Sequence, residues 1–384
     1  MPRGNGRMGA GMQIGKMPEN ALRRSVLRQI QTKREEVLHG AGIGEDCAIF
    51  SFGEETGMAV CTQEAVVAAG RETAHMETGD AVEEPAADSG SAGGAVEKAP
   101  AGGPAAGGFG AAERFLTMAD LIQKCANNLA AGGARPVAAT IALLLPVHTE
   151  EPQVRALMAA AQEKCRELSM EIAGGQTRVT AGVLQPVAVV TAYGRVLQGK
   201  GCSIKAARPG QDVVLSKWIG LQGTALIARR HRGRLRERYP AYLVEEAAGF
   251  HRYFSVLPEA EVALANGVCA MHDASEGGIL AGLWELAEGA GTGLTIDMRK
   301  LPLRQETVEV CECCGVNPYE LLSGGCLIMT AWDGPGLLGA LEAARIPAAL
   351  VGKVTDSRDR ILVNGEEIRY LDRPRTDSIY TALA

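Results

Sequence analysis

Apolar residues recur along this chain at two spacings, one typical of helices and the other typical of buried strands. Leu22, Val26, Leu27 and Ile30 fall at helical spacing and predict a helix over 20–38, with Asn20 as its N-cap. Further helices are expected at 115–131, 151–169, 224–230, 240–252, 258–266, 278–288, 304–314 and 334–345. Strands are expected at 47–52, 58–61, 137–145, 171–173, 186–196, 212–216, 294–297 and 326–331, with a terminal hairpin at 349–370. Helices and strands mix without strict alternation, which favours an α+β fold over a doubly wound sheet.

The pattern breaks between residues 68 and 112. Of these 45 residues, 27 are Gly, Ala or Pro, and branched or aromatic side chains are almost absent. Such a segment buries too little apolar area to offset the entropy of ordering it. We therefore predict a disordered insertion that loops out of the first domain, because a strand precedes it and a helix follows it.

The length indicates about two domains, at roughly 100–200 residues per domain. Residues 1–13, rich in Gly, Arg and Met, are expected to be a disordered tail. The turn at 208–212 (Arg-Pro-Gly-Gln-Asp) begins a second unit. We therefore predict an N-terminal domain over 14–207 and a C-terminal domain over 208–384.

Composition and charge favour a cytoplasmic protein. Hydrophobic residues make up 46% of the chain and charged residues 22%, which is ordinary for a globular protein. Residues 68–112 hold seven acids and two bases, so this segment carries −5 of the net −6, and no global basic surface remains. Residues 1–16 lack the apolar core of a secretion signal, and the longest apolar run, 137–145, is too short to span a bilayer. The ten cysteines are then expected to be mostly free thiols.

Two segments in the predicted N-terminal domain combine glycines with polar side chains. Gly42, Gly44 and Asp46 form a glycine turn that leads into a strand, where backbone amides can approach a phosphate and the acid can hold a cation. An ordinary tight turn is the alternative. Asn127 and Asn128 lie late in an apolar helix, before a glycine break, and a helix C-cap is the alternative for them.

Three further segments combine glycines with polar residues. Gly175, Gln176 and Thr177 follow a short strand. In the segment 271–279, His272 and Asp273 end an apolar stretch, and Ser275, Gly277 and Gly278 precede an apolar helix. Ser275 or Asp273 can cap that helix, and a helix N-terminus behind glycines also suits an anion. A fifth glycine turn, 322–326, leads into a strand and is compatible with an ordinary loop.

Two other clusters have simpler explanations. A possible zinc site is formed by Cys311, Cys313, Cys314 and Cys326, but their spacing matches no recognised zinc knuckle. We favour the interpretation that these cysteines serve as small apolar residues on a helix. Six arginines lie between residues 229 and 238, where an acidic partner or RNA could bind. A solvated helix end is favoured, so no nucleic-acid or membrane partner is predicted.

Taken in order, the five segments resemble the aminoimidazole ribonucleotide (AIR) synthase-like superfamily. This group includes AIR synthase, the hydrogenase expression/formation protein E, selenophosphate synthetase, thiamine-phosphate kinase and formylglycinamide ribonucleotide amidotransferase. The stretch 14–18 (Ile-Gly-Lys-Met-Pro) and the Gly-Ile-Gly-Glu-Asp turn are most similar to the hydrogenase-maturation branch. The resemblance covers most of 14–380. It implies a two-domain α+β fold, with an N-terminal domain that forms a dimeric β-barrel and a sandwich-like C-terminal α/β domain.

The resemblance also implies ATP bound between the glycine turns of a homodimer, with phosphorylation of an amide or carbonyl oxygen as the chemistry. The catalytic positions would be His272, Asp273 and Glu64, and the metal ligands would be Asp46 and Glu64. The nucleotide-binding positions would be Gly42, Gly44, Asp46, Thr62, Gln63, Asn127, Asn128, Gly175, Gln176, Thr177, Ser275, Gly277 and Gly278.

Three family carboxylates are replaced by amides in this chain. The positions of Gln63, Asn128 and Gln176 carry aspartate in the family pattern, and only Asp46 keeps its acid. Mg²⁺ prefers anionic oxygens, so three lost charges remove attraction of roughly several kcal/mol even at an effective dielectric near 20. A weak or absent magnesium ion is therefore expected. The Pro-Arg-Ile-Cys ending of the maturation factors is also replaced, by Tyr380 to Ala384.

Two functional hypotheses follow. The first is an ATP-binding protein similar to the hydrogenase-maturation factor, with an acceptor substrate or maturation partner that the sequence does not identify. The second is a catalytically degenerate paralogue that binds a nucleotide or a partner without turnover. The triple change from acid to amide supports the second hypothesis, whereas Asp46, Glu64 and the His272–Asp273 pair support the first.

Overall fold

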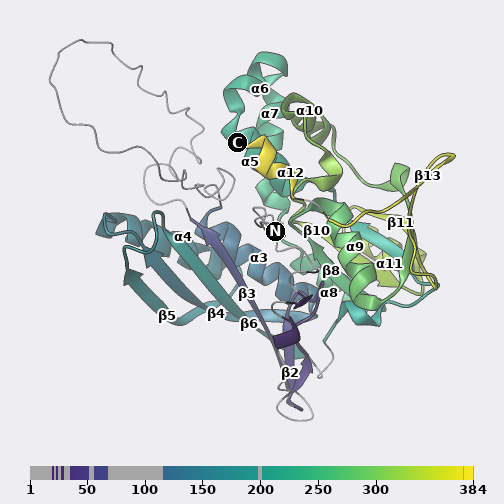
Figure 1. The fold of residues 1–384 in the computed structure, drawn as a ribbon, viewed down its shortest axis with the longest axis horizontal. Coiled ribbons are helices and arrows are strands. Elements are labelled where there is room, and N and C mark those ends of the chain that lie inside the picture. Colours follow the sequence, from purple (N-terminus) through teal and green to yellow (C-terminus); the bar gives the residue numbers. More distant parts are fainter. Residues whose placement is uncertain are drawn as a thin grey trace, which may run out of the picture.

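The computed structural model describes residues 35–51, 56–67, 116–197, 201–374 and 376–383, together with 20, 23–24 and 27–29. Figure 1 shows two sheets, each with its own helices, side by side. The tail predicted at 1–13 and the insertion predicted at 68–112 lie outside the described residues. None of the described helices is long and apolar enough to cross a membrane.

The N-terminal domain is built on a six-stranded sheet. Its strands lie in the order β1-β2-β3-β6-β4-β5, and all pairs are antiparallel except β4 with β5. The strands are β1 (Val37–His39), β2 (Ala48–Ser51), β3 (Thr56–Val66), β4 (Ala134–Leu145), β5 (Glu171–Val179) and β6 (Val187–Leu197), and a short 3₁₀ helix, η1 (Leu27–Gln29), precedes them.

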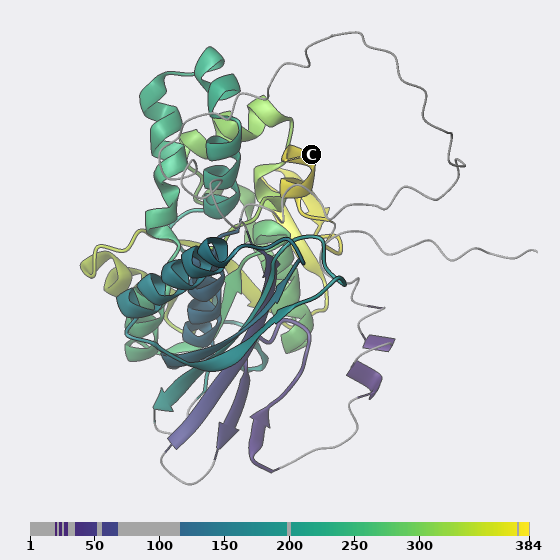
Figure 2. The ribbon, with the colours of Figure 1, turned by 90° about the vertical axis from the view of Figure 1, so that its left-hand side faces the viewer.

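Two helices, α3 (Met118–Ala131) and α4 (Glu151–Glu167), cover one face of this sheet (Figure 2). Thr117 and Asp120 start α3 with a capping box, in which each side chain accepts from the other residue's backbone N–H. Gly133, at φ 77°, turns the chain from the end of α3 into β4, a conformation that glycine adopts without strain.

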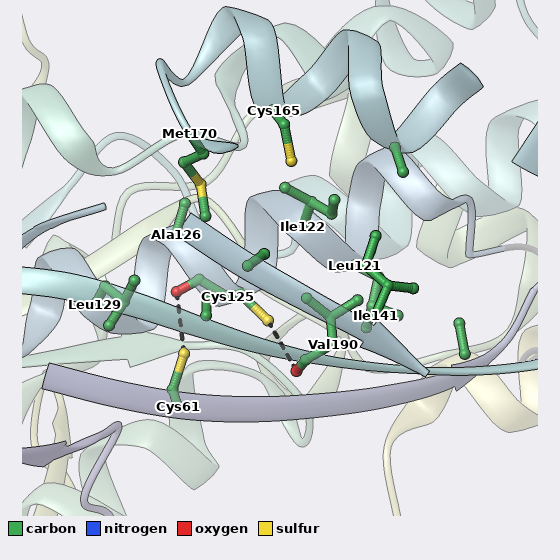
Figure 3. Close-up of a cluster of buried hydrophobic side chains, with 14 of the residues drawn as sticks. Cys61, Leu121, Ile122, Cys125, Ala126, Leu129, Ile141, Cys165, Met170 and Val190 are labelled. Carbon is green, nitrogen blue, oxygen red and sulfur yellow. Dashed lines mark hydrogen bonds between the residues drawn. The ribbon is translucent and has the colours of Figure 1, made fainter. Parts of the chain in front are cut away.

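The first core lies between this helical layer and the sheet, and small side chains build much of it. Figure 3 shows Cys61 of β3 and Cys125 of α3 among aliphatic residues such as Ile122 and Val190. The Cys61 thiol donates to the carbonyl of Cys125 at 3.3 Å, and the Cys125 thiol donates to that of Val190 at 3.7 Å. All ten cysteines are free, as predicted.

The C-terminal domain is built on a seven-stranded sheet in the order β13-β12-β9-β11-β7-β10-β8. Only β12 and β9 pair in parallel. The strands are β7 (Asp212–Ser216), β8 (Val268–Ala274), β9 (Gly293–Asp297), β10 (Cys326–Ala331), β11 (Ala348–Thr355), β12 (Arg360–Asn364) and β13 (Glu367–Tyr370). Every residue of β7 and β10 is buried, because helices cover both faces near the middle of the sheet.

The two faces of this second sheet have different neighbours. The helix α9 (Gly278–Ala290) covers one face, and α8 (Leu257–Ala265) and α11 (Gly334–Ala343) cover the other, where Ala130 and Ala131 of α3 join the same core. A separate helical group packs together at the top of Figure 1. It contains α5 (Leu221–Arg230), α6 (Arg232–Arg238), α7 (Ala241–Ala248), α10 (Gln305–Cys314) and α12 (Ser378–Ala382). Short 3₁₀ turns complete the domain: η3 (Ile204–Ala206), η4 (Gly249–Tyr253), η5 (Met298–Lys300) and η6 (Pro318–Glu320).

The structure confirms a two-domain α+β fold and corrects several expectations. The helix predicted over 20–38 is wrong at its end, where residues 37–39 form β1, which pairs with β2. The hairpin predicted at 349–370 is also wrong in part: β12 pairs with β13, but β9 lies between β11 and β12. The strand predicted at 171–173 continues to Val179. In the single chain the N-terminal sheet is open, with β1 and β5 as its edges within the described residues, so a barrel would need a second copy.

Candidate active site between the domains

His272 joins the two domains. It lies on β8 of the C-terminal domain, and its Nδ1 is 2.9 Å from the Oδ2 atom of Asp46, which comes from the glycine turn of the N-terminal domain. Its Nε2 is 3.0 Å from the Oε2 atom of Glu285 on α9. The backbone N–H of Asp273 also donates to Asp46 Oδ2, at 3.2 Å. Residues that are distant in sequence therefore meet in one buried polar cluster.

The two carboxylates keep His272 protonated. Burial lowers the pKa of His272, but the charges and hydrogen bonds of Asp46 and Glu285 outweigh burial and raise it to about 10. Each ring nitrogen then carries a hydrogen and donates it to one carboxylate. The Asp46 carboxylate is consequently paired with a cation that belongs to the protein.

The Asp273 side chain lies on the side of β8 opposite to His272, and no described residue donates a hydrogen bond to it. Its neighbour across the sheet, Leu327, belongs to the core that faces α3 and α8, whereas Ile328, opposite His272, faces α9. The residue is 4% exposed, and both of its carboxylate oxygens lack a partner among the described residues. Burial and then Asp46 raise the pKa of Asp273 to about 7, although His272, Lys124 and Lys217 lower it. Asp273 can therefore take up or release a proton near neutral pH.

A buried ion pair lies at the same end of the sheet, where the strands β7 and β8 both finish. Lys217 follows β7 directly, and its Nζ donates to Glu259 Oε1 of α8 and to the Ser255 carbonyl, both at 2.5 Å. Lys217 has a left-handed backbone with φ 51°, which is strained for a residue with a side chain. The other oxygen of Glu259 has no hydrogen-bond partner in the part of the chain that the structure describes. Such strain and unsatisfied polar atoms are typical of functional sites.

The two predicted asparagines have different surroundings. Asn127 Nδ2 donates to the Phe254 carbonyl at 2.7 Å, and Asn127 Oδ1 accepts from Val256 N at 3.1 Å and from Gln123 at 3.0 Å. The Asn127 amide therefore connects α3 to the chain that leads into α8. The Asn128 side chain is buried and forms no hydrogen bond within the described residues, so it stays available to a ligand.

The glycine turn before β2 has a packing role. Gly44 has φ 74°, and a Cβ there would lie 2.8 Å from the Glu285 carbonyl oxygen on α9. The next residue, Glu45, accepts from Ser203 at 2.9 Å and pairs with Lys205 at 3.0 Å. Contacts with the C-terminal domain thus hold the turn that carries Gly42 and Asp46 in place.

Other predicted site residues lie on the N-terminal sheet. Thr62 faces Thr191 of β6, with hydroxyl oxygens 3.0 Å apart, and Glu64 is exposed on β3. Gln63 is half-buried, and residues 175–177 are exposed on the edge strand β5. Within the described residues, none of these side chains forms a hydrogen bond or ion pair with the cluster around Asp46. The structure therefore brings Asp46, His272 and Asp273 together, with Asn127 and Asn128 on the facing helix, and leaves Glu64 apart.

The glycines before α9 have an intramolecular partner. Gly277 (φ 85°) and Gly278 (φ 71°) form the turn, and Gly277 N donates to Asp377 Oδ2 at 2.6 Å. Ser275 contributes its carbonyl to the turn, where it accepts from Gly278 N and from Ser323 N.

Sequence reasoning missed four residues of these clusters: Glu285, Lys217, Glu259 and Asp377. Glu285 could have been found, because it falls on the buried side of the predicted helix at 278–288. The other three are isolated charged residues whose partners are distant in sequence, so no local pattern marks them.

Comparison with known proteins agrees with this architecture. Residues 113–196 match the AIR synthase related protein N-terminal domain, and residues 208–364 match the AIR synthase related protein C-terminal domain. The chain belongs to the AIR synthase-related family.

Among curated relatives of this family, it is 31% identical to the carbamoyl dehydratase HypE of Rhodobacter capsulatus over 205 residues, which are 53% of this chain and 58% of that protein. It is 31% identical to the thiamine-monophosphate kinase of Corynebacterium glutamicum over 202 residues, 52% of this chain and 59% of the kinase. The matched part of the chain thus spans less than two thirds of the length of these relatives.

Several solved structures share the fold. A HypE–HypF complex superimposes with a TM-score of 0.63 at 19% identity, covering 92% of this chain and 100% of the other. The thiamine-phosphate kinase AaThiL, complexed with AMPPCP and TMP, gives 0.64 at 17% identity, with 93% and 96% covered. HypE in complex with ATP gives 0.57 at 16% identity, with 96% and 98% covered.

Proposed function

We propose that this chain binds ATP between its two domains and uses it to phosphorylate an amide or carbonyl oxygen of an acceptor, in the manner of a hydrogenase-maturation factor. The convergence of Asp46, His272 and Asp273 at the domain junction carries this proposal. Several curated relatives are named as HypE or hydrogenase expression/formation proteins, and one structural neighbour is a HypE complex with ATP. A maturation partner is part of the proposal, because another neighbour is a HypE–HypF complex.

The donor set fits a weakly held magnesium ion. The described residues include no group of three or more His, Cys, Asp or Glu side chains that could hold a metal. However, Mg²⁺ is commonly held by one or two carboxylates together with substrate phosphates and water, and Asp46 can supply one carboxylate. Asp46 would hold the ion, which would neutralise phosphate charge. Glu64, expected as a ligand, lies outside this cluster.

The residues of this chain have distinct tasks in the proposed reaction. Asn128 offers an amide without a partner to the nucleotide or acceptor, from the helix that faces β8. Asp273, with a pKa near 7, can hold the proton that an amide loses when its oxygen is phosphorylated. His272 positions Asp46, because it fixes the carboxylate between two domains.

We also propose a homodimer. The face of the N-terminal sheet opposite α3 and α4 is not covered by a helix of the described chain (Figure 2). Its residues include Val60, Thr62, Val189, Thr191 and Tyr193, which are half-buried or exposed. A second copy packed on this face would close the barrel expected from the family, and light scattering would test it.

Calorimetry with ATP, with and without Mg²⁺, tests the nucleotide, and release of phosphate tests turnover. Binding that tightens with Mg²⁺, together with hydrolysis in the presence of an amide acceptor, supports the enzyme. Binding without hydrolysis supports the alternative, a degenerate paralogue, which the replacement of three family acids by Gln63, Asn128 and Gln176 favours. Absence of ATP binding would contradict the enzyme, and of the alternative it would leave only a paralogue that binds a partner.

A further inference from the structure

Lys124 of α3 is a half-buried cation that forms no hydrogen bond or ion pair with any described residue. Asn128 follows it by one helical turn and Ala131 by two, so the three side chains share one face of α3. Ala131 belongs to the same core as Leu327, the neighbour of Asp273 across the second sheet, and Figure 1 shows α3 next to β8. Lys124 and Asn128 therefore face the second domain, on the side of β8 that carries Asp273.

Lys124 is one of three cations close enough to act on the Asp273 carboxylate. Burial, followed by a neighbouring carboxylate, raises the pKa of Asp273 to about 7, while the charges of His272, Lys124 and Lys217 oppose the rise. Carboxylates already hold two of these cations, because His272 lies between two acids and Lys217 pairs with an acid of α8. Neither oxygen of Asp273 accepts a hydrogen bond from a described residue, so Lys124 is not bonded to it. The charge of Lys124 is thus available to an anionic ligand.

The change from acid to amide at position 128 leaves this charge without a counterion. Asn128 is 6% exposed and forms no hydrogen bond with the described residues. An aspartate there, as in the family pattern, would lie one turn from Lys124, where opposite charges attract, and could also hold a metal. With asparagine, the same face of α3 presents a positive charge and a neutral amide, both of which can donate to phosphate oxygens.

We propose that Lys124 binds the phosphate groups of the ligand and supplies, within the chain itself, part of the positive charge that magnesium supplies at a site rich in carboxylates. The proposal rests on the function proposed above and names the residue that binds the polyphosphate. Asp273 on the facing strand adds negative charge, so a polyphosphate that enters between the domains needs a cation at this point. Lys124 provides it as a point charge, and the Asn128 amide donates beside it. Binding of the nucleotide therefore depends on Lys124 even without a metal.

Calorimetry on the full chain tests this proposal, with ATP and with inorganic triphosphate as probes in the presence of EDTA. We expect Lys124→Met to lower the affinity for both probes by about tenfold or more, because a hydrogen bond to a charged group contributes at least that factor. Lys124→Arg keeps the charge and should retain most of the affinity. Thermal unfolding of Lys124→Met should resemble that of the wild type, because the side chain has no described partner to lose.

A double variant exchanges the cation of the chain for a metal ligand. Lys124→Met combined with Asn128→Asp should bind ATP weakly in EDTA and gain about tenfold in affinity in Mg²⁺, whereas Lys124→Met alone should gain little. Lys164→Met is the matched control. Lys164 is also a half-buried helical lysine of the first domain, but it pairs with Glu167 of its own helix, α4. Its replacement should leave the affinity for both probes unchanged.

The outcomes separate this proposal from the proposed function. If Lys124→Met binds ATP and triphosphate in EDTA as tightly as the wild type does, the role of Lys124 is overturned while ATP binding stands. A wild type that binds ATP only in Mg²⁺ overturns it as well. If the wild type binds triphosphate through Lys124 but does not bind ATP, the phosphate site stands and the proposed nucleotide is wrong. If the wild type binds neither probe in either buffer, both proposals fail.

Discussion

His272 and Asp46 belong to different domains, yet His272 Nδ1 and Asp46 Oδ2 lie 2.9 Å apart in the buried cluster. The contact supplies Asp46 with a cation from the protein. A divalent metal that uses the same carboxylate therefore competes with an existing ion pair. The contact between His272 and Asp46 is therefore a further reason to expect weak magnesium binding.

Replacing His272 with alanine should destabilise the protein strongly. The change leaves Asp46 and Glu285 buried without their shared donor, and breaking a buried ion pair typically costs about 3–5 kcal/mol. Chemical unfolding measures the loss. His148→Ala, at an exposed histidine, is the control and should change stability by less than about 0.5 kcal/mol. Equal stability of the two variants would contradict the bridging role of His272.

Asp273 should make stability depend on pH. Its pKa is about 7 in the folded chain against 3.8 for the ordinary group, so the folded state binds more protons between these values. Stability therefore falls as pH rises from about 4 to 7, and this loss is complete above pH 7. Asp273→Asn should be more stable than the wild type at pH 8, by roughly 2–4 kcal/mol, with the difference vanishing near pH 4. Urea unfolding at several pH values measures this, and a constant difference across the range would exclude an ionised, unpaired Asp273.

The contributions of Lys217 and Glu259 to stability should depend on each other. Either single change to methionine leaves a buried charge unpaired and should cost about 3–5 kcal/mol, whereas the double change should cost much less than the sum. Unfolding free energies of the four proteins in this cycle give the coupling. The exposed pair Arg155–Glu151, changed in the same way, should show at most about 0.5 kcal/mol of coupling. Additive effects at Lys217 and Glu259 would rule out the buried pair.

The two asparagines of α3 should separate stability from binding. Asn127→Ala leaves the Phe254 carbonyl and the Val256 N–H without their hydrogen-bond partner. Each unsatisfied buried group should lower the free energy of unfolding by about 1–3 kcal/mol. Asn128→Asp restores a family carboxylate at the site and should raise the affinity of ATP in Mg²⁺ about tenfold relative to that in EDTA. Calorimetry with both buffers checks the second variant. Identical affinity in the two buffers would remove Asn128 from the metal site.

The sequence predicted the elements with strong periodicity well and predicted long-range pairing poorly. The strands β7 and β10 have the predicted bounds, because each is a short apolar run between clear turns. The pairing of β12 with β9 was not predictable, since the two strands are about 60 residues apart and nothing local selects the neighbour. The residues around 37–39 are similarly ambiguous, and pairing with β2 overrides their helical spacing.

The candidate site was predictable only where a motif carries several of its residues. His272 and Asp273 were found together with their glycine turn, and Asp46 was found with its own. The prediction grouped Glu64 with Asp46, because the family pattern places an acid near that point of the strand, whereas the structure leaves Glu64 exposed on β3. The partners of Lys217 and Asp377 come from other elements, so only folding reveals them.

The Asn127 amide has a mechanical consequence for ligand entry. It bonds to main-chain atoms on both sides of Ser255, so α3 and the start of α8 are fastened independently of any side chain in the second domain. A hinge opening of one domain away from the other would have to break these bonds together with those of Asp46. We therefore expect a ligand to reach Asp273 by local rearrangement of side chains and turns rather than by hinge opening of the two domains.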